Sequence, residues 1–252
     1  MISTTLENQI LTISFDRPDK MNAITNEMYL AAEKALLDSA DNSEVRVALF
    51  KGEGGNFTGG NDLVDFIKNP PKDNEPPVLK FLLALARYPK PVVAAINGLA
   101  VGIGTTMLAH CDYVVAAEDA RFKLPFVDLG VCPEGGSSLL FPNMMGHSLA
   151  AELLMVADIF GAEKAKQAQL LNEIVAADQV MPLAQKVAGK LARKAPAAVQ
   201  RTKAMLKQSY LAELEERITT EIHSFAELLN SPEAKEALGA FMEKRKPDFS
   251  KF

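Results

Sequence analysis

The fold is decided by the stretch Lys90-Pro91-Val92-Val93-Ala94-Ala95-Ile96-Asn97-Gly98. Its apolar run, Val92 to Ile96, is bounded by proline and glycine, a pattern typical of a strand that is buried on both faces. The chain then passes through Val101-Gly102-Ile103-Gly104 into a short apolar helix, Thr105 to His110. A glycine-rich turn between such a strand and a helix places N–H groups at a helix N-terminus, where negative charge is stabilised.

An acid in a tight frame follows a second apolar run, Tyr113 to Ala117. Glu134 is the one acid within Val131-Cys132-Pro133-Glu134-Gly135-Gly136. We interpret this region as supplying half of an oxyanion hole and a catalytic base. A base of this kind needs partial burial to raise its pKa, whereas a helix N-terminus lowers it. The alternative, that Glu134 is only a first-turn helix residue favoured by the macrodipole, stays open.

The composition limits the class of protein. With 252 residues the chain can bury a sizeable core, and its net charge of −5 argues against a general nucleic-acid surface. The two cysteines, Cys111 and Cys132, make no disulfide framework, so a reducing compartment is expected. No apolar run approaches the ~20 residues of a membrane span, and no secretory signal is recognisable. We expect a cytoplasmic protein with neither nucleic-acid nor membrane partners.

Strands and helices alternate through most of the chain, which predicts parallel α/β units. Before the central stretch we expect a β-hairpin over residues 2–6 and 10–15, a helix over 26–39 capped by Thr25, a strand over 45–50, a short helix from Leu63, a mobile surface loop over 68–77 and a helix over 78–88. After it we expect a strand over 121–124, an exposed turn over 125–130, helices over 136–145, 148–157 and 162–170, a strand over 173–176, and a helix capped by Asp178 that runs to about 194.

After Ala195-Pro196 the alternation stops. Three helices without intervening strands are expected over residues 197–210, 211–230 and 232–246, the last with Ser231 as its cap. We therefore divide the chain into an α/β core over residues 1–195 and a helical region over 196–252. A helical region of this kind packs either on the core or on a neighbouring subunit.

A second glycine-rich turn surrounds Gly59-Gly60-Asn61, after another predicted strand. If the two strands are neighbours, N–H groups of both turns converge on one carbonyl oxygen, and such donors contribute about 3–4 kcal/mol each to an oxyanion transition state. Alternatively, the glycines only let the backbone turn. Neither turn has the pattern of a phosphate loop or a dinucleotide fingerprint, and the three histidines lack metal-ligand spacing, so no metal is expected.

Four motifs carry a resemblance to a known family. They are Asp16-Arg17-Pro18-Asp19-Lys20-Met21-Asn22-Ala23, Phe57-Thr58-Gly59-Gly60-Asn61-Asp62, Lys90 to Gly98, and Cys111-Asp112. On these motifs the chain resembles the crotonase (enoyl-CoA hydratase/isomerase) superfamily from about Thr12 onward. The resemblance implies an α/β crotonase (ClpP-like) spiral of ββα units over residues 1–195, with a C-terminal helical trimerisation region over 196–252. It also implies an acyl-CoA thioester substrate, no cofactor apart from the coenzyme A of the substrate, and a homotrimer or dimer of trimers.

The resemblance also implies the site residues. An enolate would be held by the backbone N–H groups of Asn61 and Ile103, with Glu134 as the catalytic acid/base. By analogy with the family, two loops would bind coenzyme A and a set of apolar side chains would line the acyl pocket. The implied substrate-binding residues are Lys20, Asn22, Ala23, Gly60, Asp62, Leu63, Phe66, Gly102, Phe126 and Leu129.

Departures from the family pattern select the reaction. Hydratases of the family carry two glutamates that handle the water, and this chain has Thr106 and Phe126 at those positions. Its Pro-Glu-Gly is similar to that of peroxisomal-type 3-enoyl-CoA to 2-enoyl-CoA isomerases, in which the glutamate moves the proton. An isomerase acting through Glu134 is therefore predicted. The alternatives are an enoyl-CoA hydratase, another crotonase-type lyase or hydrolase, and a non-catalytic acyl-CoA-binding scaffold.

Overall fold

A computed structural model describes residues 1–68 and 75–252 of the chain, without the side chains of residues 66–68. The predicted mobile loop over residues 68–77 lies mostly outside the described residues. Two sheets form within the described part. The larger has the strand order β1 (Ile2–Glu7), β2 (Ile10–Phe15), β3 (Val47–Gly52), β4 (Val92–Ile96), β6 (Tyr113–Ala117) and β9 (Glu173–Val175). The smaller has the order β5 (Leu99–Val101), β7 (Arg121–Lys123) and β8 (Phe160–Gly161).

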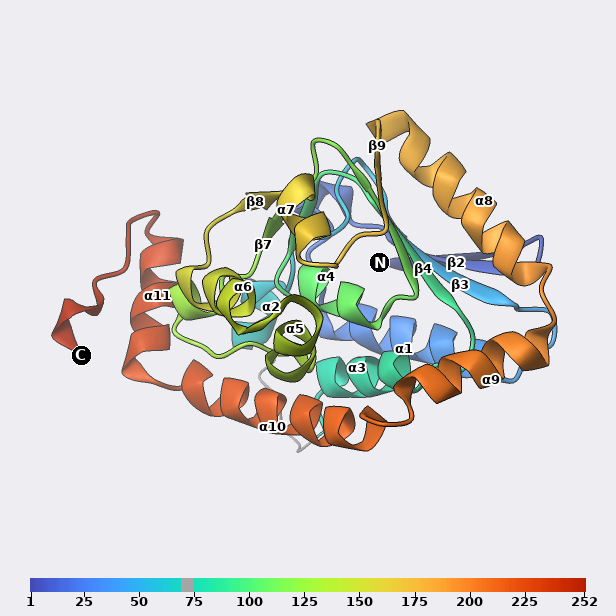
Figure 1. Ribbon diagram of the computed structural model, residues 1–252. Helices are drawn as coiled ribbons and strands as arrows, with labels where there is room; N and C mark the ends of the chain where they lie inside the picture. The colour runs from blue at the N-terminus through green and yellow to red at the C-terminus, as the bar shows by residue number, and fades with distance from the viewer. Residues whose placement is uncertain (69–74) are drawn as a thin grey trace.

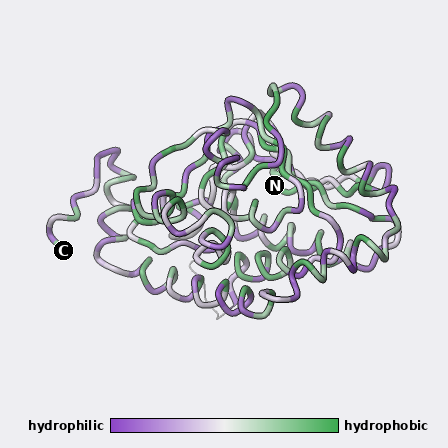
Figure 2. The backbone as a smooth tube through the Cα atoms, in the orientation of Figure 1, coloured by the Kyte–Doolittle hydropathy of each residue, from purple (hydrophilic) through white to green (hydrophobic). Residues whose placement is uncertain are grey.

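The larger sheet confirms the predicted alternation. β1 and β2 form the expected antiparallel hairpin, and from β2 to β9 all neighbouring strands run parallel. Every residue of β4 is buried, as a continuous apolar run in a parallel sheet requires. Figure 2 shows the strongly hydrophobic segments concentrated in the interior of the molecule.

The helices cover both faces of the larger sheet and extend beyond it (Figure 1). They are α1 (Asn26–Ala40), α2 (Leu63–Lys68), α3 (Pro77–Arg87), α4 (Ile103–Thr106), α5 (Ser137–Met145), α6 (His147–Ala151), α7 (Ala162–Gln167), α8 (Val180–Ala192), α9 (Pro196–Lys207), α10 (Leu211–Leu229) and α11 (Pro232–Met242). Single turns of 3-10 helix are η1 (Pro18–Lys20), η2 (Met107–His110), η3 (Val127–Leu129), η5 (Ala177–Gln179) and η6 (Phe249–Lys251), and η4 (Glu152–Val156) is a π-helical turn.

Local chemistry sets several helix ends. The Thr25 hydroxyl accepts from Met28 N and the Ser231 hydroxyl from Ala234 N, so both predicted caps are confirmed. The predicted Asp178 cap is wrong, because residues 177–179 form η5 and α8 begins after Gln179 without a side-chain cap. The predicted helix over 148–157 changes into the π-helical η4 after Ala151.

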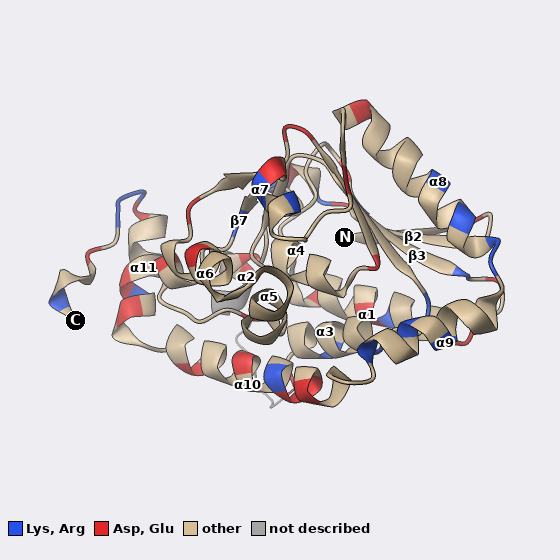
Figure 3. Ribbon diagram, viewed as in Figure 1, with Lys and Arg blue, Asp and Glu red and all other residues tan. Residues whose placement is uncertain are grey.

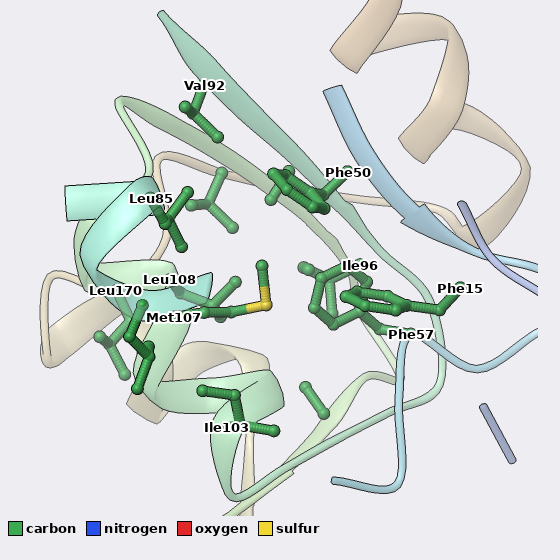
Figure 4. Close-up of a cluster of buried hydrophobic side chains, with 14 of the residues drawn as sticks. Phe15, Phe50, Phe57, Leu85, Val92, Ile96, Ile103, Met107, Leu108 and Leu170 are labelled. Carbon is green, nitrogen blue, oxygen red and sulfur yellow. The ribbon is translucent and has the colours of Figure 1, made fainter. Parts of the chain in front are cut away.

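A hydrophobic cluster anchors the stretch that follows β4. Figure 4 shows Ile103 and Met107 projecting from the same short helical segment towards the cluster that contains Phe57 and Ile96. The exposed fraction is zero for all four side chains. Each side chain of this size contributes about 1.5–3 kcal/mol to stability on full burial. The turn between β5 and α4 is therefore held against a closely packed core.

The helical region after Pro196 folds back on the core of its own chain. α10 lies along α3 and α5, and α11 packs against η3 (Figure 1). Lys203 of α9 joins Asp112 at 2.6 Å and tethers this region to the start of β6. Figure 3 shows Lys and Arg on α9 and mainly Glu on α10, while the central strands are mostly free of charge. Within residues 1–68 and 75–252, no helix combines the length and apolar composition needed to cross a bilayer.

Candidate active site

The two glycine-rich turns lie side by side. β3 and β4 are neighbours, and the segments that follow them are joined by a parallel bridge between Thr58 and Ala100. Asn61 lies three residues after Thr58, and Ile103 lies three residues after Ala100. Gly60 makes this approach possible, because its φ is +88° and a Cβ there would lie 2.8 Å from the Val101 carbonyl oxygen. The glycines therefore do more than allow the chain to turn.

Within residues 1–68 and 75–252, the N–H groups of Asn61 and Ile103 lack the backbone acceptors that neighbouring N–H groups have. Asp62 N donates to Ile24 O at 2.9 Å, and Gly102 N donates to Lys123 O at 2.9 Å. Among the described residues, none accepts from the N–H of Asn61. Ile103 is the first residue of α4, where the N–H has no acceptor within its own helix. Both groups are therefore open to an acceptor from a ligand, and their role as an oxyanion hole stays a prediction.

Glu134 is buried between the core and the helical region, with 1 % of its surface exposed. Its Oε1 accepts from Thr106 Oγ1 at 2.6 Å, whereas its Oε2 has no partner among the residues described. Burial raises the pKa of Glu134 to about 8, against the opposing effect of the Thr106 hydrogen bond. The alternative of a first-turn helix residue is wrong, because α5 begins only at Ser137.

Several contacts hold the loop around Glu134. His110 Nε2 lies 2.7 Å from Gly135 O, and Ser137 Oγ donates to the carbonyl oxygen of Glu134 at 2.6 Å. Gly135 has a φ of +76°, and a Cβ there would meet Thr106 Oγ1 at 3.0 Å. The carboxyl group is thus fixed by its neighbours in the sequence and by Thr106 across the site.

Glu221 of α10 is a second buried acid beside this loop, and the sequence interpretation missed it. Its carboxylate accepts from Gly136 N at 2.6 Å and from Ser138 N at 2.9 Å, so it caps α5 from another helix. Its exposed fraction is 6 %. A signal was present, because Glu221 falls three residues after Ile218 and seven after Leu214, on the apolar face of α10.

A small pocket, partly open to solvent, lies next to Glu134. Its lining is apolar except for Asn61 and Glu134, which suits a ligand with a hydrocarbon part. The other lining residues are Pro76, Val78, Ile222, Phe225, Ala226 and Leu229. Tyr29 braces Asn61 from α1, since its buried hydroxyl donates to Asn61 Oδ1. The last four lining residues all belong to α10, which the sequence interpretation did not place at the site.

The predicted acyl-pocket residues differ from the lining of this pocket. Leu63, Phe126 and Leu129 do not line this pocket. Phe126 is turned into the core with 3 % exposed, although the turn that follows it, η3, is exposed at Val127 and Asp128 as predicted. The side chain of Phe66 lies outside the described residues. The apolar wall comes from α10 in their place.

The predicted coenzyme A loops are braced internally. Asn22 is fully buried and donates to Glu53 O and Asn56 O, so its side chain positions the loop and does not face a ligand. Asp62 pairs with Arg17 at 2.5 Å and accepts from two N–H groups at the start of α2. Lys20 is exposed and Ala23 half-buried, which leaves both accessible. Gly60 and Gly102 stand beside the two candidate N–H donors.

Comparisons with known proteins agree with this geometry. The chain matches the family described as Enoyl-CoA hydratase/isomerase over residues 5–251. It is 45% identical to Pseudomonas aeruginosa OdaA, with a TM-score of 0.92 over 96% of this chain and 98% of that one. An enoyl-CoA hydratase/isomerase structure from Pseudoalteromonas atlantica T6c is 36% identical, with a TM-score of 0.94 over 99% of each chain.

A named relative extends the match. The 2,3-dehydroadipyl-CoA hydratase of Escherichia coli (strain K12) is 31% identical over 247 residues, which are 96% of each protein. The mixed strands and helices, together with these matches, confirm the predicted crotonase spiral. The chain belongs to the enoyl-CoA hydratase/isomerase family and is an enzyme of the crotonase type.

Proposed function

We propose that this enzyme is an acyl-CoA isomerase that shifts the double bond of a 3-enoyl-CoA to give the trans-2-enoyl-CoA. One observation carries the proposal. Among the described residues, Glu134 is the one acid in the pocket lining. Thr106 and Phe126 stand where the family resemblance implies the two glutamates of hydratases, and neither side chain takes a proton at neutral pH.

The proposed reaction uses the two free N–H groups and one carboxyl group. The thioester oxygen accepts from the N–H groups of Asn61 and Ile103, which stabilise the negative charge that develops there. Glu134, in its ionised form, takes the proton from C2, and the electrons of that C–H bond extend into a dienolate. The protonated carboxyl then gives the same proton to C4 while the double bond forms between C2 and C3. No atoms are gained or lost.

The environment of Glu134 suits both steps. Its Oε1 stays with Thr106 Oγ1, and its unpartnered Oε2 is available to the substrate carbon atoms. A pKa of about 8 leaves the carboxyl basic enough to take a weakly acidic proton, and it can then hold that proton between the steps. The apolar wall from α10 excludes water, which limits competing hydration of the product.

Binding of coenzyme A and assembly remain predictions. The exposed Lys20 offers a cation for a phosphate group of coenzyme A, and Ala23 and Gly60 lie along the same side of the two turns. The expected homotrimer, or dimer of trimers, is tested by light scattering coupled to size-exclusion chromatography. A mass of three or six chains supports that assembly, and a monomer contradicts it.

A hydratase is the second candidate, and the name of the Escherichia coli relative favours it. A hydratase needs a group that activates water, and Glu134 would have to do so alone. A third candidate, a scaffold that binds acyl-CoA without turnover, keeps the pocket but makes no use of the acid. The isomerase, the hydratase and the scaffold are distinguished by how each acts on a 3-enoyl-CoA and on a 2-enoyl-CoA.

The test is absorbance at the conjugated enoyl-thioester band, with trans-3-hexenoyl-CoA and crotonyl-CoA in parallel reactions. A rise with the first and no loss with the second supports the isomerase. Loss of the crotonyl-CoA band without any rise from the other substrate identifies a hydratase and contradicts the proposal. Tight binding of both substrates without turnover of either identifies a scaffold and contradicts it as well.

A further inference from the structure

The N-terminus of α5 is occupied by a side chain from a distant part of the sequence. α5 spans nine residues and begins directly after Glu134-Gly135-Gly136. The N–H groups at such a helix start attract a carboxylate, and Glu134 is the nearest acid in the sequence. The carboxylate that takes them belongs to Glu221, whose two oxygens accept from Gly136 N and Ser138 N.

We propose that Glu221 is a positioning residue for Glu134: it takes the N–H groups at the start of α5, so that Glu134 is left with Thr106 as its hydrogen-bond donor and turns its second oxygen to the substrate. This inference rests on the proposed function for the role of Glu134 as the acid/base. No backbone N–H group in the described residues donates to the side-chain carboxyl group of Glu134, whereas two donate to that of Glu221. The two buried acids thus differ in their hydrogen bonds: the Glu221 carboxylate accepts from the start of α5, and the Glu134 carboxyl group does not.

The bond pattern indicates that Glu221 is ionised. Both of its oxygens act as acceptors, as in a carboxylate that caps a helix. Burial raises the pKa of Glu221, but the hydrogen bonds from residues 136 and 138 and the charge of Arg217 oppose that rise. Its negative charge adds to the effect of burial in raising the pKa of Glu134. Glu221 therefore withholds the helix donors and also disfavours ionisation of Glu134.

The other groups that face this pair are uncharged at neutral pH, with the exception of Arg217. Burial raises the pKa of Tyr29 and of Cys132, so both stay protonated. His110, which contacts Gly135 O, has a pKa lowered to about 4 by burial and stays neutral. Arg217 Nη1 donates to Ser138 Oγ at 3.3 Å, on the Glu221 side of the loop. Within residues 1–68 and 75–252, Glu221 is thus the one negative charge that acts on Glu134.

The first experiment measures kcat/KM for the isomerisation against pH in the wild type, in Glu221→Gln and in Glu216→Gln. Glu216 is an exposed acid on the same helix and gives a matched loss of charge. We expect the acid limb of the Glu221→Gln profile to move to lower pH, because Glu134 loses a like charge and gains access to the helix N-terminus. The Glu216→Gln profile should coincide with the wild type. A Glu221→Gln profile that is lower but has an unmoved midpoint would mean a merely structural role and overturn the proposal.

The second experiment needs no substrate. Carbon NMR of protein labelled at the glutamate carboxyl carbons follows both acids, with Glu134→Gln used for assignment. In the wild type, Glu221 should ionise at lower pH than Glu134, and in Glu221→Gln the Glu134 midpoint should fall. If Glu221 is protonated at neutral pH in the wild type, the proposal is overturned even where Glu221→Gln does not fold.

The two experiments separate the inference from the proposed function. If no substrate is isomerised but the Glu134 midpoint falls in Glu221→Gln, the proposed function fails and the coupling of the two acids stands. If isomerisation occurs and depends on Glu134, but the titration midpoint of Glu134 is the same in the wild type and in Glu221→Gln, the proposed function stands and the role of Glu221 is disproved.

Discussion

The two walls of the pocket are built in different ways. One wall consists of Asn61 in the loop after β3, Pro76 and Val78 at the start of α3, and Glu134 in the loop between η3 and α5. The other is a single face of α10 and contributes Ile222, Phe225, Ala226 and Leu229. Both polar residues of the lining stand on the first wall. The difference shows that the reactive groups and the apolar enclosure of the pocket come from separate parts of the chain.

Removing the acid from the first wall should have the largest effect. We expect Glu134→Gln to lower kcat for isomerisation by about 10²–10⁴-fold, since general acid–base catalysis contributes that much. Substrate binding should change little, because the amide keeps the shape of the carboxyl group. The measurement is steady-state kinetics with trans-3-hexenoyl-CoA. Turnover near the wild-type rate would remove Glu134 from the mechanism.

The same variant should change stability in a way that depends on pH. The folded-state pKa of Glu134, about 8, lies above the unfolded-state pKa. At pH values between these two pKa values, the folded protein therefore binds more protons than the unfolded protein. Its stability therefore falls as pH rises through that window. Glu134→Gln lacks this dependence and should be the more stable protein at pH 8, as measured by urea denaturation. If the free energies of unfolding of Glu134→Gln and the wild type differ by the same amount at every pH, the raised pKa of Glu134 is contradicted.

The close approach of the two turns gives the next largest effect. Gly60→Ala must place its Cβ 2.8 Å from the Val101 carbonyl at a φ of +88°, whereas Gly102→Ala has a similar positive φ of +54° but open space. Backbone strain alone costs about 1–3 kcal/mol in each variant. We expect Gly60→Ala to lose about 10²-fold in kcat, in line with a displaced oxyanion donor, and Gly102→Ala to lose less. Equal losses would show that contact between the turns is unimportant.

The sequence predicted the first wall much better than the second. The β4 run, the turns at Gly60 and Gly102, and the framed Glu134 are local patterns, and each fixes its own backbone geometry. The caps at Thr25 and Ser231 are local in the same sense. α10 was also predicted as a helix, but its docking against the pocket depends on tertiary packing that no local pattern contains.

The errors follow the same division. β5 was missed because its three residues lie between Gly98 and Gly102 and were interpreted as part of a turn, and β8 because it has only two residues. The turn over residues 125–130 is exposed at Val127 and Asp128 as expected, but the Phe126 side chain is buried in the core, which its local sequence did not indicate. Glu221 was missed because an acid on a helix is usually solvated, and its two partners lie more than 80 residues away in the sequence.

Changing the second wall should alter selectivity more than rate. Phe225→Ala enlarges the apolar pocket, so we expect kcat/KM to rise for longer acyl chains and to fall by about 10-fold for trans-3-hexenoyl-CoA. Val78→Ala is the matched change on the first wall, where the side chain is 4 % exposed and packs into the core. It should lower stability and change chain-length preference less than Phe225→Ala does, because it removes a smaller side chain from the lining. A chain-length series with both variants makes the measurement, and identical series would contradict separate roles for the walls.

The smallest expected effect tests the hydrogen bond that opposes burial at Glu134. Thr106→Val removes the hydroxyl that donates to Glu134 Oε1, and this bond favours the ionised carboxyl. The pKa of Glu134 should therefore rise further, so that the acid limb of kcat/KM moves to higher pH and activity at pH 7 falls several-fold. Thr105→Val is the control, because its hydroxyl donates to Ala100 O, away from the acid. Both variants lose one buried hydrogen bond, at about 1 kcal/mol of stability each. Only Thr106→Val should move the midpoint, and since Thr106 and Glu221 act on the pKa of Glu134 in opposite directions, its shift should be opposite in sign to that of Glu221→Gln.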